Sequence, residues 1–204
     1  MKKIYGYVVL TVLLLGIATA LETKATDGKV KIFPIEACYA MDVYNPVEVV
    51  KEADYVFAGH VESVDGTIYK RKIWPRQENG KLVYSGDAYT EYTVTVQSNL
   101  KKKLPVGETI VLSKMGGIRE DGSGYDLFED DFLPEVGKNY IFIANEQADG
   151  SLIVSGANSN IEINESNLKS VAAIKSAKEY KIYEKAVKQQ TADTESLKND
   201  MQNK

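Results

Sequence analysis

His60 is the only histidine in this chain of 204 residues. Its side chain is the one best suited to act as a general base near neutral pH. A catalytic triad or a metal centre would add partners at fixed spacing, such as a Gly-x-Ser-x-Gly turn or a paired histidine, and the sequence contains neither motif. We therefore interpret His60 as a solvent-facing or edge residue and not as a catalytic one.

Cys38 is the only cysteine. An odd cysteine in an exported protein can pair with another chain or react as a thiol. A thiol nucleophile needs a nearby base, and the one histidine lies 22 positions further along without a supporting motif. We interpret Cys38 as a small buried residue, and whether it stays free or pairs between chains remains open. Because no intramolecular disulfide can form, the domain must be held together by its core.

An acidic segment follows the middle of the chain and could offer hard oxygen ligands to calcium. Its acids are Asp126, Glu129, Asp130 and Asp131. The preceding Asp121-Gly-Ser-Gly invites comparison with an EF-hand, but the spacing fails because Phe132 falls where the bidentate glutamate is needed. We expect a solvated acidic loop, and calcium binding there stays an open question.

No other motif in the chain carries recognisable chemistry. The sequence contains no phosphate-binding loop, dinucleotide fingerprint or zinc-ligand spacing. We therefore predict no catalytic residue, no cofactor-binding residue, no metal ligand and no cofactor.

The first residues have the pattern of a secretion signal. Lys2 and Lys3 precede 17 uncharged residues that end in Ala18-Thr19-Ala20, a typical cleavage site. This stretch is shorter than the roughly 20 apolar residues that a membrane span requires. We expect cleavage after residue 20, with residue 25 as the alternative, and a secreted or cell-surface protein without a stable membrane span.

The charge of the chain bears on its partners. Removing residues 1–20 removes two lysines and no acid, so the formal net charge changes from −4 to −6. A modestly acidic chain with interspersed charges argues against nucleic acid as a partner. The triplet Lys101-Lys102-Lys103 is a basic cluster that we expect to lie in an exposed loop.

Apolar periodicity predicts the elements that would position these residues. A short helix should begin at Asn45-Pro46-Val47-Glu48, where an N-cap, a proline at the first helical position and a capping-box glutamate coincide. From residue 53 the period changes to two, which is typical of strands. We expect strands near 53–62, 92–97, 109–114, 139–144 and 152–154, with irregular segments at 67–87 and 118–131. The first irregular segment has turn signals at Asn79-Gly80 and Ser85-Gly86 and one candidate hairpin arm at 81–84.

The strand at 139–144 decides the architecture. Tyr140 and Phe142 point to one side while Ile141 and Ile143 point to the other, so both faces should be buried. Five strands with uneven connections favour a five-stranded Greek-key barrel of the OB type over an immunoglobulin-like sandwich of about seven strands.

A helix after Asn164 or Ser166 is expected to cover the two isoleucines of that strand. Its apolar side chains include Leu168, Val171 and Tyr180. The fold class is therefore mainly β, with a short N-terminal helix and a C-terminal helix. The predicted organisation is a signal peptide at 1–20, a flexible segment at 21–37, an OB domain at 38–160, a helix at 161–188 and a polar tail at 189–204.

Three segments also carry a family resemblance. ADYVFAGHVESV, YTEYTVTVQSNLKKKLPVGETIVLSKMGG and DLFEDDFLPEVGKNYIFIA resemble exported Gram-positive bacterial proteins with a domain similar to the tissue inhibitors of metalloproteinases. The resemblance covers roughly residues 38–156 and implies a netrin-like OB barrel with an extracellular binding role. The inhibitors chelate zinc through an amino-terminal cysteine fixed by disulfides. Here some 17 mature residues precede Cys38 and no second cysteine exists, so that route and its residue roles are not carried over.

These observations favour an exported non-enzymatic binding module that engages a protein or a cell-envelope component. Two alternatives remain, namely a metal-dependent hydrolase using the acidic loop and a structural surface protein anchored through its C-terminal helix. The sequence leaves open the ligand, the physiological process and the oligomeric state.

Overall fold

The computed structural model describes residues 31–78, 81–164 and 170–202, and their side chains except those of 72–78, 81–85 and 197–202. The predicted signal peptide and the predicted turn at Asn79-Gly80 lie outside the described residues. With 44% strand and 22% helix, the chain belongs to the mainly β class, as predicted.

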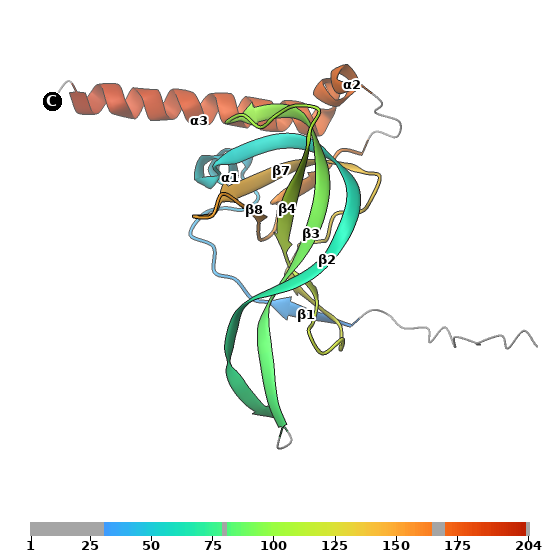
Figure 1. The fold of residues 1–204 in the computed structure, drawn as a ribbon. Helices are drawn as coiled ribbons and strands as arrows, with labels where there is room; N and C mark the ends of the chain where they lie inside the picture. Colours follow the sequence, from blue (N-terminus) through green and yellow to red (C-terminus); the bar gives the residue numbers. More distant parts are fainter. Residues whose placement is uncertain (1–30, 79–80, 165–169, 203–204) are drawn as a thin grey trace, which may run out of the picture.

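Five strands form a ring-like sheet around the main core (Figure 1). They are β2 (Tyr55–Glu78), β3 (Lys81–Lys101), β4 (Thr109–Met115), β8 (Leu152–Val154) and β7 (Asn139–Glu146), in this spatial order, and β7 pairs with β2 again. The β4–β8 pairing is parallel, whereas the other four are antiparallel. The sheet is not a closed barrel. Strand β8 is short, with three residue pairs to β4 and two to β7.

Strand β9 (Asn160–Glu162) continues along the edge of β7 that β8 also uses. A loop of residues 155–159 separates the two short strands. This loop therefore connects β8, a strand of the ring, to β9, which pairs with β7 outside the five ring strands, and its anchoring affects both short strands.

The region from 67 to 87 differs from the predicted irregular segment. Strands β2 and β3 run on past the ring as a two-stranded ribbon in which Glu78 pairs with Lys81 (Figure 1). Register shifts, including one between Lys70 and Ile73, interrupt the ladder. Because each bulge moves side chains to the other face, the period-two pattern disappears from the sequence although the strands continue.

A second, small sheet was not predicted. It contains β1 (Ile32–Ile35), β6 (Tyr125–Phe128) and β5 (Gly117–Ile118), with β1 and β6 parallel. The segment expected to be flexible thus contributes a strand, and so does the segment expected to be irregular after Ile118. Strands of two to four residues carry too little periodicity to be recognised, and their pairing is set by distant partners.

The interior of the ring is filled by the side chains that the alternation predicted. Tyr92, Val94 and Val96 point inward and are at most 1% exposed. The ring of Phe142 lies 5.5 Å from that of Phe57 and 5.6 Å from that of Tyr140. These aromatic contacts form the centre of the domain core.

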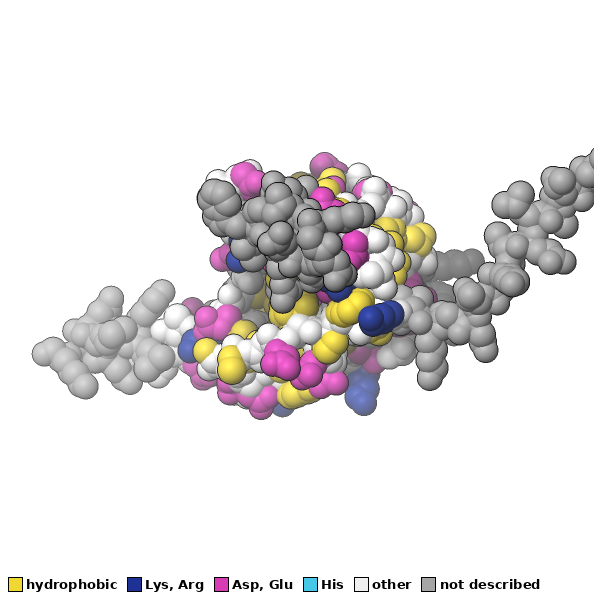
Figure 2. Space-filling model, turned by 90° about the horizontal axis from the view of Figure 1, so that it is seen from below, with side chains coloured by type: hydrophobic (Ala, Val, Ile, Leu, Met, Phe, Trp, Pro, Cys, Tyr) yellow, Lys and Arg dark blue, Asp and Glu magenta, His cyan; other side chains and the backbone are white. Residues whose placement is uncertain are grey.

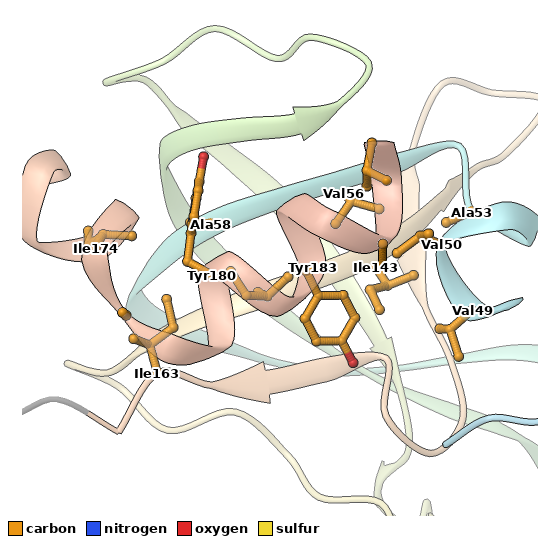
Figure 3. Close-up of a cluster of buried hydrophobic side chains, with 14 residues drawn as sticks. Val49, Val50, Ala53, Val56, Ala58, Ile143, Ile163, Ile174, Tyr180 and Tyr183 are labelled. Atoms are coloured by element: carbon orange, nitrogen blue, oxygen red, sulfur yellow. The ribbon is translucent and has the colours of Figure 1, made fainter. Parts of the chain in front are cut away.

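Helices cover one outer face of the ring, where a second apolar cluster forms (Figure 3). Ile141 and Ile143 pack there against α1 (Pro46–Glu52), α2 (Val171–Ser176) and α3 (Lys178–Gln202). This confirms the prediction that the C-terminal helix covers the two isoleucines, and α1 shares the task. The predicted cap is also confirmed, since the Asn45 side chain accepts a hydrogen bond from the Val47 amide at 3.1 Å.

The C-terminal helical region begins later and extends further than predicted. Ser170 caps α2, and Ala177 has an extended backbone that separates it from α3. Helix α3 then continues to Gln202, through most of the predicted polar tail. The predicted cap Ser166 and the predicted contact residue Leu168 lie outside the described residues, and Val171 is 42% exposed. No helix in the described ranges is long and apolar enough to cross a membrane.

Candidate functional site

The residues that the sequence analysis considered for chemistry are His60, Cys38 and the acidic segment, and they lie apart from one another in the fold. His60 is half-buried on β2, with its Nδ1 atom 2.9 Å from the amide oxygen of Asn139. The same oxygen accepts a hydrogen bond from Gln97 at 2.9 Å. This polar network between β2, β3 and β7 gives His60 a positioning partner in the sheet.

The interpretation of Cys38 as a buried residue is wrong. Its side chain is an exposed free thiol. The reason is local, because residues 36–40 run over the surface between β1 and α1. A small, moderately apolar residue in a connecting segment gives no periodic pattern from which its burial could be predicted.

The acidic segment does not form a common site. The Asp130 carboxylate accepts a hydrogen bond from the Tyr44 hydroxyl at 2.7 Å, and that of Asp126 lies 3.7 Å from Arg119. Glu129 is exposed, whereas the side chain of Asp131 is buried, which corrects the prediction of a solvated loop at this residue. Within the described ranges, no three His, Cys, Asp or Glu side chains gather as metal ligands would.

Asp131 belongs to a buried ion pair at one end of the ring interior. Its Oδ2 atom lies 2.5 Å from Nζ of Lys114, and the two side chains are 1% and 0% exposed. The same ammonium donates hydrogen bonds to Ser159 Oγ at 2.9 Å and to the Gly156 carbonyl at 3.3 Å. The pair thereby ties β4 to the acidic segment and to loop 155–159.

Burial determines the protonation behaviour of this pair. Removal from water lowers the pKa of Lys114 to about 8 and raises the pKa of Asp131, and the attraction between the two groups opposes both shifts. Because neither side chain is accessible, the pair has no route to a substrate, and we assign it a structural role. Strand parity could have revealed it, since Lys114 shares the inward face with Leu112.

A trough that is accessible to solvent lies on the outside of the ring, away from the face that the helices cover. It consists of two adjoining hollows of about 550 and 690 Å³ that share Lys70, Asp149 and Ser151. The first is lined further by Arg71, Tyr89, Met115, Asn145, Gln147, Ala148, Ile153 and Ser155. The second is lined further by Tyr55, Ile68, Glu91, Leu104, Ile110, Val111, Ser113, Gly150 and Leu152. The base of the β2–β3 ribbon, strand β4 and the β7–β8 turn thus form its walls and floor.

The two ends of the trough differ in chemistry. Around Ile68, Ile110 and Val111 the lining is largely apolar, and Val111 is 60% exposed. The other end carries amide and hydroxyl side chains together with Arg71. Two cations and two acids, Glu91 and Asp149, line the whole trough. A ligand that combines apolar and uncharged polar groups therefore complements it best.

Several contacts fix the trough before any ligand arrives. The Arg71 guanidinium donates a hydrogen bond to the Tyr89 hydroxyl at 3.3 Å, and Lys70 Nζ lies 5.0 Å from the Tyr89 ring. Arg71 has a positive φ of 49° beside the register shift, so the bulge directs its side chain. At the opposite wall, the Asp149 carboxylate accepts hydrogen bonds from the Ser151 amide and hydroxyl, which lower the pKa of Asp149.

The residues of the trough escaped prediction because they come from six separate parts of the chain. No protein-family model matches this chain, and a search of curated proteins also finds no match. The assignment of function therefore depends on the geometry above.

Proposed function

We propose that this chain is an exported, non-enzymatic binding module of the netrin-like OB type that engages a protein or a cell-envelope component through the trough. The strand order β2-β3-β4-β8-β7 supports the OB part. OB folds bind ligands on the face of their second and third strands, between the loops after the first and fourth strands. The corresponding elements here are β3, β4, the β2–β3 ribbon and the β7–β8 turn, which line the trough.

The observation that carries the proposal is the exposed apolar floor of a preformed hollow. Val111 is 60% exposed between Ile110 and the polar side chains of the opposite wall. An apolar surface inside a concave, partly polar site is typical of ligand recognition. A metal-dependent hydrolase gains no support, because Asp126, Asp130 and Asp131 are each held by a different partner.

The test is capture of a component from culture supernatant and envelope fractions by the immobilised chain starting at Leu21. Val111→Glu places a charge on the floor of the trough, while Val136→Glu places the same charge on a valine that is 55% exposed elsewhere. We expect the parent and the Val136→Glu variant to retain the same component and the Val111→Glu variant to lose it. Equal capture by all three proteins would refute binding at the trough.

The export part rests on the pattern of residues 1–20 and has its own test. Amino-terminal sequencing of secreted material should begin at Leu21, or at Thr26 if the second site is cleaved. An intact Met1 in the membrane fraction would contradict export with cleavage while leaving the trough proposal untouched.

A further inference from the structure

The outer face of α3 presents a row of lysines. Lys178, Lys181, Lys185 and Lys188 follow one another at intervals of three or four residues, which places them on one side of the helix. All four are exposed. The opposite side of the helix buries Tyr180, Tyr183 and Val187 against the sheet, so the lysine row faces away from the domain.

These lysines differ from several others whose ammonium groups have partners within the domain. Lys101 donates to the Val50 carbonyl at 2.7 Å, and Lys102, Lys114 and Lys138 each pair with an acid. On α3, Lys188 pairs with Glu184, whereas Lys178, Lys181 and Lys185 have neither an ion pair nor a hydrogen-bond partner within the described residues. Positive charge thus remains uncompensated along this face, in a chain whose net charge is −4.

The surface is also hollowed. Ser176, Lys178, Lys181, Ile182 and Lys185 line a shallow depression of about 510 Å³, and Ile182 is 41% exposed within it. The row from Lys178 to Lys188 spans ten residues, or about 15 Å of helix. The face of the molecule away from α3 shows both acidic and basic side chains (Figure 2), whereas the row on α3 consists of lysines alone.

We propose that this lysine row is a docking surface for a linear polyanion that carries phosphate groups. Charge complementarity selects an anionic occupant, and the length of the row selects one with several charges in succession. The row holds lysines and no arginine, and lysine binds phosphate as a point charge, without the planar bidentate geometry by which arginine recognises both carboxylate and phosphate.

A membrane surface fits these observations less well. Helices that lie in a membrane interface bury a broad apolar face in the lipid. The apolar face of α3 is already packed on the sheet, and Ile182 is the one large apolar side chain within the lysine row. The row can therefore contact an anionic polymer without inserting.

The experiment measures binding of inorganic polyphosphate to the chain starting at Leu21 at several salt concentrations. Lys181→Gln/Lys185→Gln removes two charges from the row and keeps good helix formers there. Lys51→Gln/Lys103→Gln is the matched control, since it removes two other exposed lysines. We expect the row variant to lose about ten-fold in affinity at low salt, and its logarithmic salt dependence to become shallower by about 1.4. The control should stay within about two-fold of the parent.

Comparison ligands make the outcome decisive. Polyglutamate and vesicles with or without phosphatidylglycerol replace polyphosphate in parallel titrations. Equal losses in both variants would show that net charge alone acts, and equal binding of polyglutamate would refute phosphate selectivity. Binding to anionic vesicles but not to polyphosphate would refute the polymer, and absence of polyphosphate binding by the parent would refute the proposal as a whole.

Discussion

Two outer faces of the same ring-like sheet are used in opposite ways. On the face of β2 and β7, the outward side chains Val56, Ala58, Ile141 and Ile143 are at most 5% exposed beneath the helices. On the face of β4, outward Val111 is 60% exposed, and its outward neighbour along the strand, Ser113, is polar and 4% exposed. Adjacent apolar side chains on an outer face require a cover, whereas an apolar side chain among polar ones can stay hydrated and available to a ligand.

Both faces depend on loop 155–159 and on the Lys114–Asp131 ion pair that holds it. Breaking this pair should produce the largest loss of stability. Loop 155–159 leads from β8, beneath the trough, to β9, beside the covered face, and Lys114 holds it. Asp131→Asn leaves the Lys114 ammonium buried without its counter-charge, which should cost about 3–5 kcal/mol of stability. Denaturant unfolding measures this cost, and hydrogen exchange should show faster opening on both faces.

The neighbouring acid provides the control for this substitution. Asp130 is exposed and has a positive φ of 57°, a conformation that asparagine tolerates well. Asp130→Asn should therefore change stability by less than about 1 kcal/mol. Similar costs for the two variants would contradict the role assigned to the buried pair.

The second prediction concerns the covered face alone. Ile141 is fully buried between the sheet and the helices, so Ile141→Ala should cost about 2–5 kcal/mol through lost burial and a residual cavity. Hydrogen exchange should accelerate in α3 before it accelerates in β4. If β4 and α3 opened together, the two faces would form one cooperative unit and the comparison would fail.

The third prediction is that the contribution of the Lys114–Asp131 pair to the free energy of unfolding depends on pH. Between pH 8 and the ordinary lysine pKa of 10.5, the unfolded chain holds a proton that buried Lys114 has lost, so stability rises with pH. Above the ordinary aspartate pKa of 3.8, folded Asp131 keeps a proton that the unfolded chain has lost, so stability falls as pH rises.

The pair should therefore make its least favourable contribution near neutral pH. The measurement is the difference in unfolding free energy between the parent and Lys114→Met/Asp131→Leu, recorded from pH 4 to 10. A maximum of this difference at neutral pH would show that attraction outweighs desolvation, contrary to the directions of the two pKa shifts.

The sequence predicted the covered face better than the open one for a physical reason. Ile141 and Ile143 alternate with Tyr140 and Phe142, so four successive apolar residues indicated burial on both sides of one strand. The need for a helical cover followed from that pattern alone. The Asn45 cap was equally local, because its partners lie within three residues.

The open face and its support depend on contacts that no local pattern contains. Bulges near Lys70 erased the strand alternation along the ribbon, and the trough combines six separated segments. Lys114 and Asp131 each look like ordinary surface residues until the fold places them together. Strand parity could have marked Lys114 as inward-facing, but its partner comes from an irregular segment.

The smallest expected effect completes the comparison. Val111→Ala removes apolar atoms from a side chain that is 60% exposed, so stability should change by no more than about 0.5 kcal/mol. Val136→Ala, at a valine 55% exposed outside the trough, is the control. Denaturant unfolding of both variants, compared with Ile141→Ala, measures whether the position or the residue type decides the change in stability.

A loss of stability at Val111 as large as that at Ile141 would mean that the open face is buried in solution by a second copy of the chain or by another segment. An unchanged stability together with weaker ligand capture would instead establish that this valine contributes to binding and not to folding.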